Sequence, residues 1–129
     1  MPIRIVQLGT PRHRNEGLRV GTVRRPPRGV SKEDFASRDY YDVWFPILAP
    51  SQGLVSHALA STDDKSWKSF EKKYRAEMAK PEPARTLGLL VAMSKQTSFS
   101  VGCYCENPER CHRSILASLL SASGAEIVG

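Results

Sequence analysis

Short runs of β-branched and aromatic residues alternate with longer helical patterns in this chain, and this alternation constrains the fold more than any other feature. Strands are predicted over residues 3–8, 18–23, 41–48, 98–105 and 125–129. Helices are predicted over residues 31–38, 63–80, 81–95 and 111–123. Several connections between strands are long enough for crossovers, so mostly parallel pairing is expected. The chain is therefore interpreted as a single compact α/β domain over residues 1–129, a Rossmann-like sandwich with a mostly parallel sheet flanked by helices.

Local signals set the expected ends and buried faces of these elements. Ser31 and Asp34 resemble a capping box and are expected to open the helix over residues 31–38. The stretch LAPSQGL, residues 48–54, is predicted to be a loop. Four apolar residues share one face of the helix over residues 63–80: Trp67, Phe70, Tyr74 and Met78. In the next helix the inward residues are Leu87, Leu90 and Val91.

The aromatic run YYDVWF lies in the strand over residues 41–48, which Pro46 restricts to a sheet edge or an early end. Val43 and Phe45 are explained most simply by core packing. Stacking of the aromatic residues on a nucleic-acid base is the alternative. Exposure is expected for the residues at the start of the run, Tyr40, Tyr41 and Asp42.

The charge of the chain is unevenly distributed along it. The formal net charge is +6, and residues 1–30 contain seven arginines, no lysine and one acidic residue, Glu16. Arginine presents a flat set of donors that fits phosphate and carboxylate groups. The basic N-terminal part therefore indicates an anionic partner, either a small molecule or a nucleic acid, with a solvated basic face as the alternative.

The N-terminal segment has no apolar stretch typical of a signal peptide, and no apolar run approaches the roughly 18 residues of a membrane span. A cytoplasmic protein without a membrane partner is expected. Three cysteines, an odd and clustered number, also argue against a disulfide framework. Reduced thiols are the favoured interpretation.

The cysteines lie in CYCENPERCHR, residues 103–113, between a predicted strand and a predicted helix. Cys103 and Cys105 are two residues apart, so an extended strand puts them on one face. Asn107 and Pro108 predict a turn. Cys111 then lies at or near the first turn of the helix. Ligands bind at the carboxyl ends of strands in α/β folds, so this strand–loop–helix unit is a candidate site.

The first interpretation of this unit is an anion or phosphate pocket. The N–H groups at the start of the helix and the guanidinium of Arg113 are suited to bind an anion. Arg24 and Arg28 also follow a strand and are expected to converge on the same ligand. The structural alternative is that Arg113 pairs with a nearby acid, Glu106 or Glu109.

The second interpretation is catalysis by a reactive cysteine. Cys111 at a helix start, or Cys103 under the loop, is expected to have a lowered thiol pKa, and His112 can carry protons. The alternative is that these cysteines are small buried core residues. The spacing does not match the phosphatase loop, which has five residues between cysteine and arginine.

The third interpretation is a zinc site. The candidate ligands are Cys103, Cys105, Cys111 and His112. The spacing is unusual for structural zinc, and adjacent ligands on a helix diverge by about 100°. No cofactor is therefore predicted, and zinc is kept as an alternative.

Four segments resemble a known family. VRRPPRGVSKEDF is similar to the segment D-R-x-x-P-R-G-[VL]-x-K-E of the YeaO-like branch of domain-of-unknown-function family 488. WFPILAPS and WKSFEKKYRAEM resemble two further stretches of that branch, and GCYCENPERCHRSILA resembles the wider family's C-x-E-x-x-P-x-x-C-H-R-x-x-L-A. The similarity spans about residues 3–122 in the same order.

The resemblance implies a compact α/β domain and no particular reaction. The matching residues are Arg24, Pro27, Arg28, Cys103, Pro108, Cys111, His112 and Arg113. The chain departs from the family pattern at two acidic positions, which are Val23 and Cys105 here. These departures weaken a general acid–base mechanism and leave anion binding intact.

The preferred hypothesis is a pocket that binds a nucleotide, a phosphorylated metabolite or a nucleic-acid end. Its predicted anion-binding residues are Arg24, Arg28 and Arg113. If it is enzymatic, the predicted catalytic residues are Cys103, Cys111 and His112. The alternatives are a nucleic-acid-binding accessory protein with a structural cysteine cluster and a zinc-stabilised domain.

Overall fold

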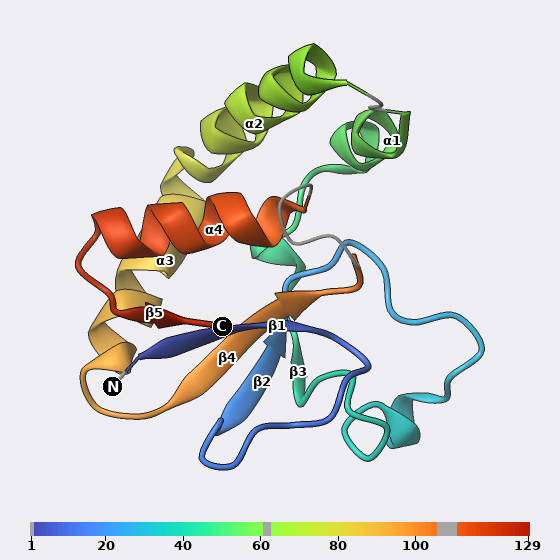
Figure 1. Cartoon of the computed structure of the whole chain (residues 1–129), viewed down its shortest axis with the longest axis vertical. Coiled ribbons are helices and arrows are strands. Elements are labelled where there is room, and N and C mark those ends of the chain that lie inside the picture. The colour runs from blue at the N-terminus through green and yellow to red at the C-terminus, as the bar shows by residue number, and fades with distance from the viewer. Residues whose placement is uncertain (1, 61–62, 106–110) are drawn as a thin grey trace.

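The sheet has five strands, and every neighbouring pair is parallel. The computed structural model describes residues 2–60, 63–105 and 111–129, with side chains for all of them except 57–60. The strands are β1 (Ile3–Gln7), β2 (Leu18–Gly21), β3 (Val43–Trp44), β4 (Phe99–Cys103) and β5 (Ile127–Val128). Their order across the sheet is β3-β2-β4-β1-β5 (Figure 1).

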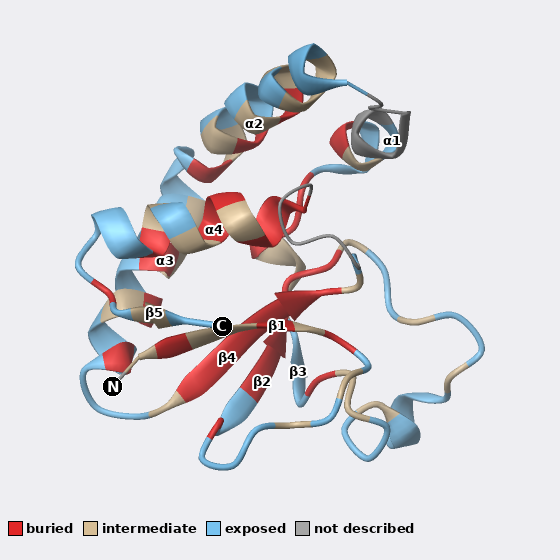
Figure 2. Cartoon of the chain, in the orientation of Figure 1, coloured by how far each residue is buried: buried red, intermediate tan, exposed pale blue. Residues whose placement is uncertain are grey.

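The strand β4 is the centre of the sheet. Its first residue, Phe99, is in register with Ile3 of β1 on one side and with Leu18 of β2 on the other. All five residues of β4 are buried, as Figure 2 shows. The carboxyl end of β4 therefore lies deep in the molecule, beside the end of β2.

The helices contribute to one hydrophobic core. They are α1 (Gln52–Ala60), α2 (Asp64–Met78), α3 (Pro81–Ser94) and α4 (His112–Ala122). The core contains Ile3, Val20, Phe99 and Val101 of the sheet together with helix residues Leu54, Phe70, Tyr74, Met78, Leu87, Leu90, Ile115, Leu116 and Leu120. The strand residues of this set share one face of the sheet, because successive side chains of a strand alternate between faces. Figure 2 shows the buried side of α4 turned toward the sheet.

The opposite face of the sheet carries a buried ion pair. Arg19 is fully buried, and its Nε and Nη2 donate to the two carboxylate oxygens of Glu16 at 2.7 and 2.9 Å. Its Nη1 donates to the backbone oxygens of Thr10 and Asp39. Ser100 of β4 donates to the same carboxylate at 2.7 Å. These contacts satisfy the buried charges and tie the loops on this face to the sheet.

The predicted fold is confirmed: the chain forms a single α/β domain with a parallel sheet and helices. The strands and the three long helices occur where the apolar pattern predicts them, with ends shifted by a few residues. In α2, Phe70, Tyr74 and Met78 are buried and Trp67 packs beside them, as expected. In the described part of the chain, no helix has the length and apolar character needed to cross a bilayer.

Of two predictions for the segment after β2, one is wrong and the other is confirmed. In place of a helix over residues 31–38, only a 3-10 turn forms at Lys32–Asp34. The Ser31 hydroxyl donates to the Asp34 carboxylate and does not cap the backbone, so no longer helix is started. The strand predicted at 41–48 forms as the short edge strand β3 and ends before Pro46, as the proline predicts. A 3-10 turn follows at Pro46–Leu48, because proline provides no ladder donor.

The burial of the aromatic run also differs from the prediction. Tyr41 is buried, with 3% of its surface exposed, because it packs against the backbone of Gly21 and edge-on against Phe35. Val43 is 39% exposed, because its strand is the edge of the sheet. Phe45 packs beside the core as expected.

The helix α1 forms where the stretch over residues 48–54 predicts a loop. Its start is held by Glu77 of α2, whose carboxylate accepts hydrogen bonds from the backbone N–H and the hydroxyl of Ser51. This cap comes from a distant part of the chain, so the local sequence does not indicate it.

Candidate functional site

The predicted site residues other than Arg113 lie around the carboxyl ends of the neighbouring strands β2 and β4. The backbone N–H of Thr22, just after β2, donates to Gly102 of β4 at 3.0 Å, and its hydroxyl donates to the same oxygen at 2.9 Å. Cys103 is the last residue of β4, and Cys111 is the N-cap of α4. The predicted position of Cys111 at the start of the helix is therefore correct.

A cavity of about 620 Å³ opens at these strand ends. Its walls are mainly apolar: Val23, Pro26, Pro27, Tyr40, Pro50, Val55, Phe70 and Tyr104. Cys103, Cys111 and His112 also line it, as do three arginines, Arg24, Arg25 and Arg28. Arg24 and Arg28 thus meet the cysteine–histidine cluster in one cavity, as the sequence predicts.

The arginines of the cavity differ in what they contact. The guanidinium of Arg24 donates to the backbone oxygens of Pro46, Ala49 and Pro50 at 2.9–3.2 Å, so it holds the segment before α1 in place. Arg25 is exposed and donates to the side-chain oxygen of Gln52. Arg28 is exposed and has no hydrogen-bond partner within the described part of the chain. The donors available to a ligand are therefore mainly those of Arg28 and Arg25.

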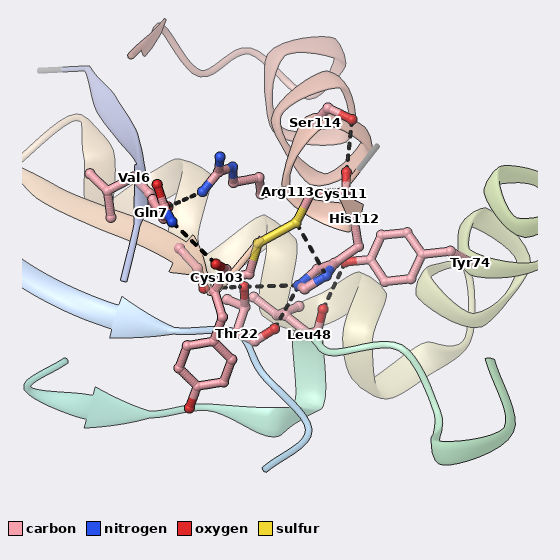
Figure 3. Close-up of a disulfide and its surroundings, with 12 residues drawn as sticks. Val6, Gln7, Thr22, Leu48, Tyr74, Cys103, Cys111, His112, Arg113 and Ser114 are labelled. Carbon is pink, nitrogen blue, oxygen red and sulfur yellow. Dashed lines mark hydrogen bonds between the residues drawn. A yellow bond between two sulfur atoms is a disulfide. The ribbon is translucent and has the colours of Figure 1, made fainter. Parts of the chain in front are cut away.

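Arg113 does not belong to the lining of the cavity. It is 5% exposed, and its Nη1 donates to the backbone oxygen of Val6 in β1 at 3.1 Å. Figure 3 shows its side chain directed toward Val6, while the ring of His112 points toward Tyr74. The predicted alternative partners, Glu106 and Glu109, and the predicted turn at Asn107 and Pro108 lie outside the described residues.

Cys103 and Cys111 are joined by a disulfide (Figure 3). This corrects the expectation of reduced thiols, because the fold brings Cys103 at the end of β4 next to Cys111 at the start of α4. Both residues are 1% exposed. The disulfide form has no free thiol at either position, so neither cysteine can act as a nucleophile unless the bond is reduced.

Cys105 lies apart from the other two cysteines. The strand β4 ends at Cys103, so the two-residue alternation that predicts a common face for Cys103 and Cys105 does not continue. Cys105 is exposed and free. Although the residue is exposed, its sulfur is partly desolvated, and this raises the thiol pKa against the opposing effect of the positive charge of Arg113.

His112 is buried, and its ring is fixed on both edges. Its Nε2 lies 2.7 Å from the backbone oxygen of Thr22, and its Nδ1 lies 3.9 Å from Cys111 Sγ. The ring of Tyr74 packs edge-on against it, with centroids 5.5 Å apart. Burial lowers the pKa of His112 from 6.5 to about 4. The hydrogen bond with Thr22 raises this pKa, whereas the positive charge of Arg113 lowers it further. His112 is therefore neutral near pH 7.

Two aromatic residues complete the wall of the cavity. The hydroxyl of Tyr104 donates to the backbone oxygen of Arg25 at 2.8 Å, and its ring packs edge-on against Tyr40 at 6.3 Å. Tyr104 is not among the site residues predicted from the sequence, although it lies between two of the predicted cysteines. Arg25 was also missed, although it directly follows Arg24.

Other N-terminal arginines are engaged within the protein. Arg12 forms an ion pair with Asp42 at 2.8 Å and lies 3.5 Å from Asp39, and the pKa of Asp42 is lowered because hydrogen bonds from Arg12 and Arg19 outweigh burial. Arg19 is paired with Glu16. The basic excess of the N-terminal part therefore serves the fold as well as the cavity.

Within residues 2–60, 63–105 and 111–129, the cluster of side chains that can hold a metal ion consists of Cys103, Cys111 and His112. Their ligand atoms all lie within 4.8 Å of one another. Cys105, the fourth predicted ligand, is not part of this cluster.

The chain matches a known protein-family model. A family model described as DUF488-N3a, the active DUF488-N3 subclade, matches residues 3–124. No curated protein and no solved structure matches the chain.

Proposed function

This chain belongs to the DUF488 family, as its motifs predict, and on that premise we propose that its cavity binds a small molecule with a phosphate and a flat apolar body, of the nucleotide class. The observation that carries this proposal is the combination of apolar walls and arginine donors around one cavity at the ends of β2 and β4. Nucleotides, phosphorylated metabolites and nucleic-acid ends share the phosphate group that these donors fit.

The apolar walls support a ligand with a flat body. Small-molecule sites are mostly apolar cavities of about 300–1,000 Å³ with a few polar groups that fix orientation. The ring of Tyr104 is anchored through its hydroxyl, and the ring of Tyr40 packs against it. Rings that are already fixed lose little conformational entropy when a base or a similar group packs on them.

The arginines support a phosphate at the rim. Arg28 has no competing partner among the described residues, so binding an anion takes its guanidinium from none of them. Arg25 is held by the neutral amide of Gln52. A phosphate is a stronger acceptor than a neutral amide, because charge-assisted hydrogen bonds are roughly twice as strong as neutral ones.

Any reaction on such a ligand would use the sulfur atoms of Cys103 and Cys111 and the imidazole of His112, which line the same cavity. Catalysis by these residues remains a prediction of the sequence, as does nucleic-acid binding as an accessory function.

Binding is tested by calorimetry and thermal shift on the full chain. The panel contains a nucleoside monophosphate for each base, the matching nucleosides, ribose 5-phosphate and inorganic phosphate. We expect a nucleotide to bind more tightly than its nucleoside, and Arg28→Ala to weaken binding about tenfold or more, the value of a charge-assisted hydrogen bond. The matched control is Arg14→Ala, which removes an exposed arginine outside the cavity lining.

Two results would contradict the proposal. The first is a folded wild-type chain that binds no member of the panel. The second is an equal loss of affinity in Arg28→Ala and Arg14→Ala, which indicates a diffuse charge effect. A single-stranded oligonucleotide that binds with a steep salt dependence, while nucleotides do not bind, would favour the accessory function, since backbone contacts release counterions.

A further inference from the structure

The cluster of Cys103, Cys111 and His112 has the composition of a metal site, and the geometry of each residue points to the same conclusion. Two sulfurs and one imidazole nitrogen lie within 4.8 Å of one another, and all three residues are buried. Thiolate and imidazole are the ligands that zinc prefers. The proposed nucleotide site does not require this cluster to hold a metal, so the two proposals are independent.

The proton of His112 is positioned as in a metal-bound histidine. A backbone oxygen can only accept, so the 2.7 Å contact with Thr22 means that Nε2 carries the proton. In the neutral ring, Nδ1 then has a free lone pair, and it faces Cys111 Sγ at 3.9 Å. Metal-ligating histidines typically donate their other N–H to a carbonyl or carboxylate, which fixes the tautomer and the ring. Here Thr22 and the edge-on ring of Tyr74 orient His112 before any ion is bound.

The extended backbone of Cys111 allows two adjacent residues, Cys111 and His112, to bind the same ion. Residues within a helix diverge by about 100° per position, which separates the side chains of neighbours. Cys111 is the N-cap, with an extended backbone (φ −127°, ψ 146°), and the helix begins only at His112. The two neighbours therefore turn their side chains to the same point (Figure 3).

The separation of the two cysteine backbones also suits a bridging ion. The Cα atoms of Cys103 and Cys111 are 7.7 Å apart. Two thiolates at about 2.3 Å from a tetrahedral zinc ion are roughly 3.8 Å from each other, so an ion between the two sulfurs is compatible with this backbone separation.

We propose that the reduced chain binds one Zn²⁺ through Cys103 Sγ, Cys111 Sγ and His112 Nδ1, with the fourth coordination position open to the cavity. Three protein ligands and one open position are typical of catalytic rather than structural zinc. An ion at this position supplies a Lewis acid to a ligand in the cavity.

The disulfide and the zinc site exclude each other, because both use the same two sulfurs. Reduction of the bond takes two electrons and two protons, and a dithiol supplies them as it becomes a disulfide. Each cysteine then releases its thiol proton when its sulfur binds the ion. The oxidised chain is therefore the metal-free form of this site.

Metal analysis of the full chain tests the proposal. The protein is reduced, freed of metal, and titrated anaerobically with Zn²⁺ or Co²⁺, with no nucleotide present. We expect one ion per chain for the reduced protein and none for the oxidised protein. Co²⁺ should give the intense visible bands of a tetrahedral site and a thiolate charge-transfer band.

Variants identify the ligands. Cys103→Ser and Cys111→Ser are each expected to weaken zinc binding at least 100-fold and to remove part of the charge-transfer band. Cys105→Ser is the matched control, because it changes a free cysteine outside the cluster, and it should bind zinc as the wild type does. Circular dichroism verifies that each variant is folded.

Three outcomes would overturn the proposal: no ion bound by the folded, reduced wild type; undiminished binding by folded Cys103→Ser; or loss of the ion in folded Cys105→Ser. If the two serine variants at the cluster do not fold, the wild-type Co²⁺ spectrum decides the question. A spectrum without thiolate charge transfer then excludes these ligands.

Discussion

The backbone oxygen of Thr22 fixes the proton of His112: the 2.7 Å contact places it on Nε2, deep between β2 and α4. Burial lowers the pKa of His112 from 6.5 to about 4. In the metal-free, oxidised chain, the unfolded state therefore takes up this proton first as the pH falls.

We expect the free energy of unfolding to fall between pH 6.5 and 4 by roughly 3 kcal/mol through this group, and the loss to be complete below pH 4. The measurement is urea denaturation across this pH range for the wild type and His112→Gln. The variant should lack this part of the pH dependence. Parallel curves for the two proteins would mean that His112 is not kept neutral by the fold.

The buried ion pair of Arg19 and Glu16 predicts a large effect of a single substitution. Arg19→Met leaves the Glu16 carboxylate buried without its main partner, and we expect the free energy of unfolding to fall by about 3–5 kcal/mol. Arg14→Met, which changes an exposed arginine in the loop before β2, should change it by less than about 0.5 kcal/mol. Equal effects of the two substitutions in chemical denaturation would contradict this assignment.

The same pair sets a second pH window. Burial raises the pKa of Glu16, but hydrogen bonds from Arg19, Ser100 and the His13 backbone outweigh it and lower the pKa to about 2. The stabilisation is therefore present above pH 4.5 and is lost as the pH falls toward 2. Glu16→Gln should flatten the stability curve in this window while leaving the His112 window unchanged.

The hydroxyl of Tyr41 predicts a stabilising substitution. It is buried and has no hydrogen-bond partner among the described residues. Removing an unsatisfied buried hydroxyl removes its desolvation cost, so Tyr41→Phe should leave stability unchanged or raise the free energy of unfolding by up to about 1 kcal/mol. Tyr74→Phe is the comparison, because the Tyr74 hydroxyl donates to Leu48 at 2.7 Å, and its loss should destabilise the chain. Thermal unfolding of both variants checks the difference in sign.

Arg113 and Arg28 are expected to separate stability from ligand binding. Arg113→Ala leaves the Val6 oxygen without this donor and should lower the free energy of unfolding by about 1–3 kcal/mol, with nucleotide affinity kept. Arg28→Ala should weaken nucleotide binding and leave the free energy of unfolding nearly unchanged. A loss of nucleotide affinity in folded Arg113→Ala would show that this buried guanidinium acts on the ligand after all.

The sequence predicts those features of the fold that depend on a periodic pattern within a single helix or strand. Phe70, Tyr74 and Met78 follow the helical period, and Cys111 precedes an evident helix, so their positions were correct. Motifs predict the membership of the family, and the position of Arg24 and Arg28 directly after a strand predicts their approach to the cysteine cluster.

The remaining features depend on partners that are distant in the sequence. Arg24 donates to backbone oxygens around Pro50, and Arg113 donates to the backbone oxygen of Val6. The start of α1 is capped by Glu77. The local sequence shows that these residues are charged, but it does not show which distant group each of them binds. For this reason the sequence predicted three equivalent anion-binding arginines, while the structure gives them different contacts.

The order of the strands in the sheet has a consequence for synthesis of the chain. The strand β1 is made first, but its neighbours are β4 at Phe99–Cys103 and β5 at Ile127–Val128, both in the last quarter of the chain. A nascent chain that ends before β4 therefore has an N-terminal strand with both edges unpaired. Because such non-local pairing slows folding and exposes strand edges, we expect the sheet, and with it the cavity, to form only after β4 and β5 have been synthesised.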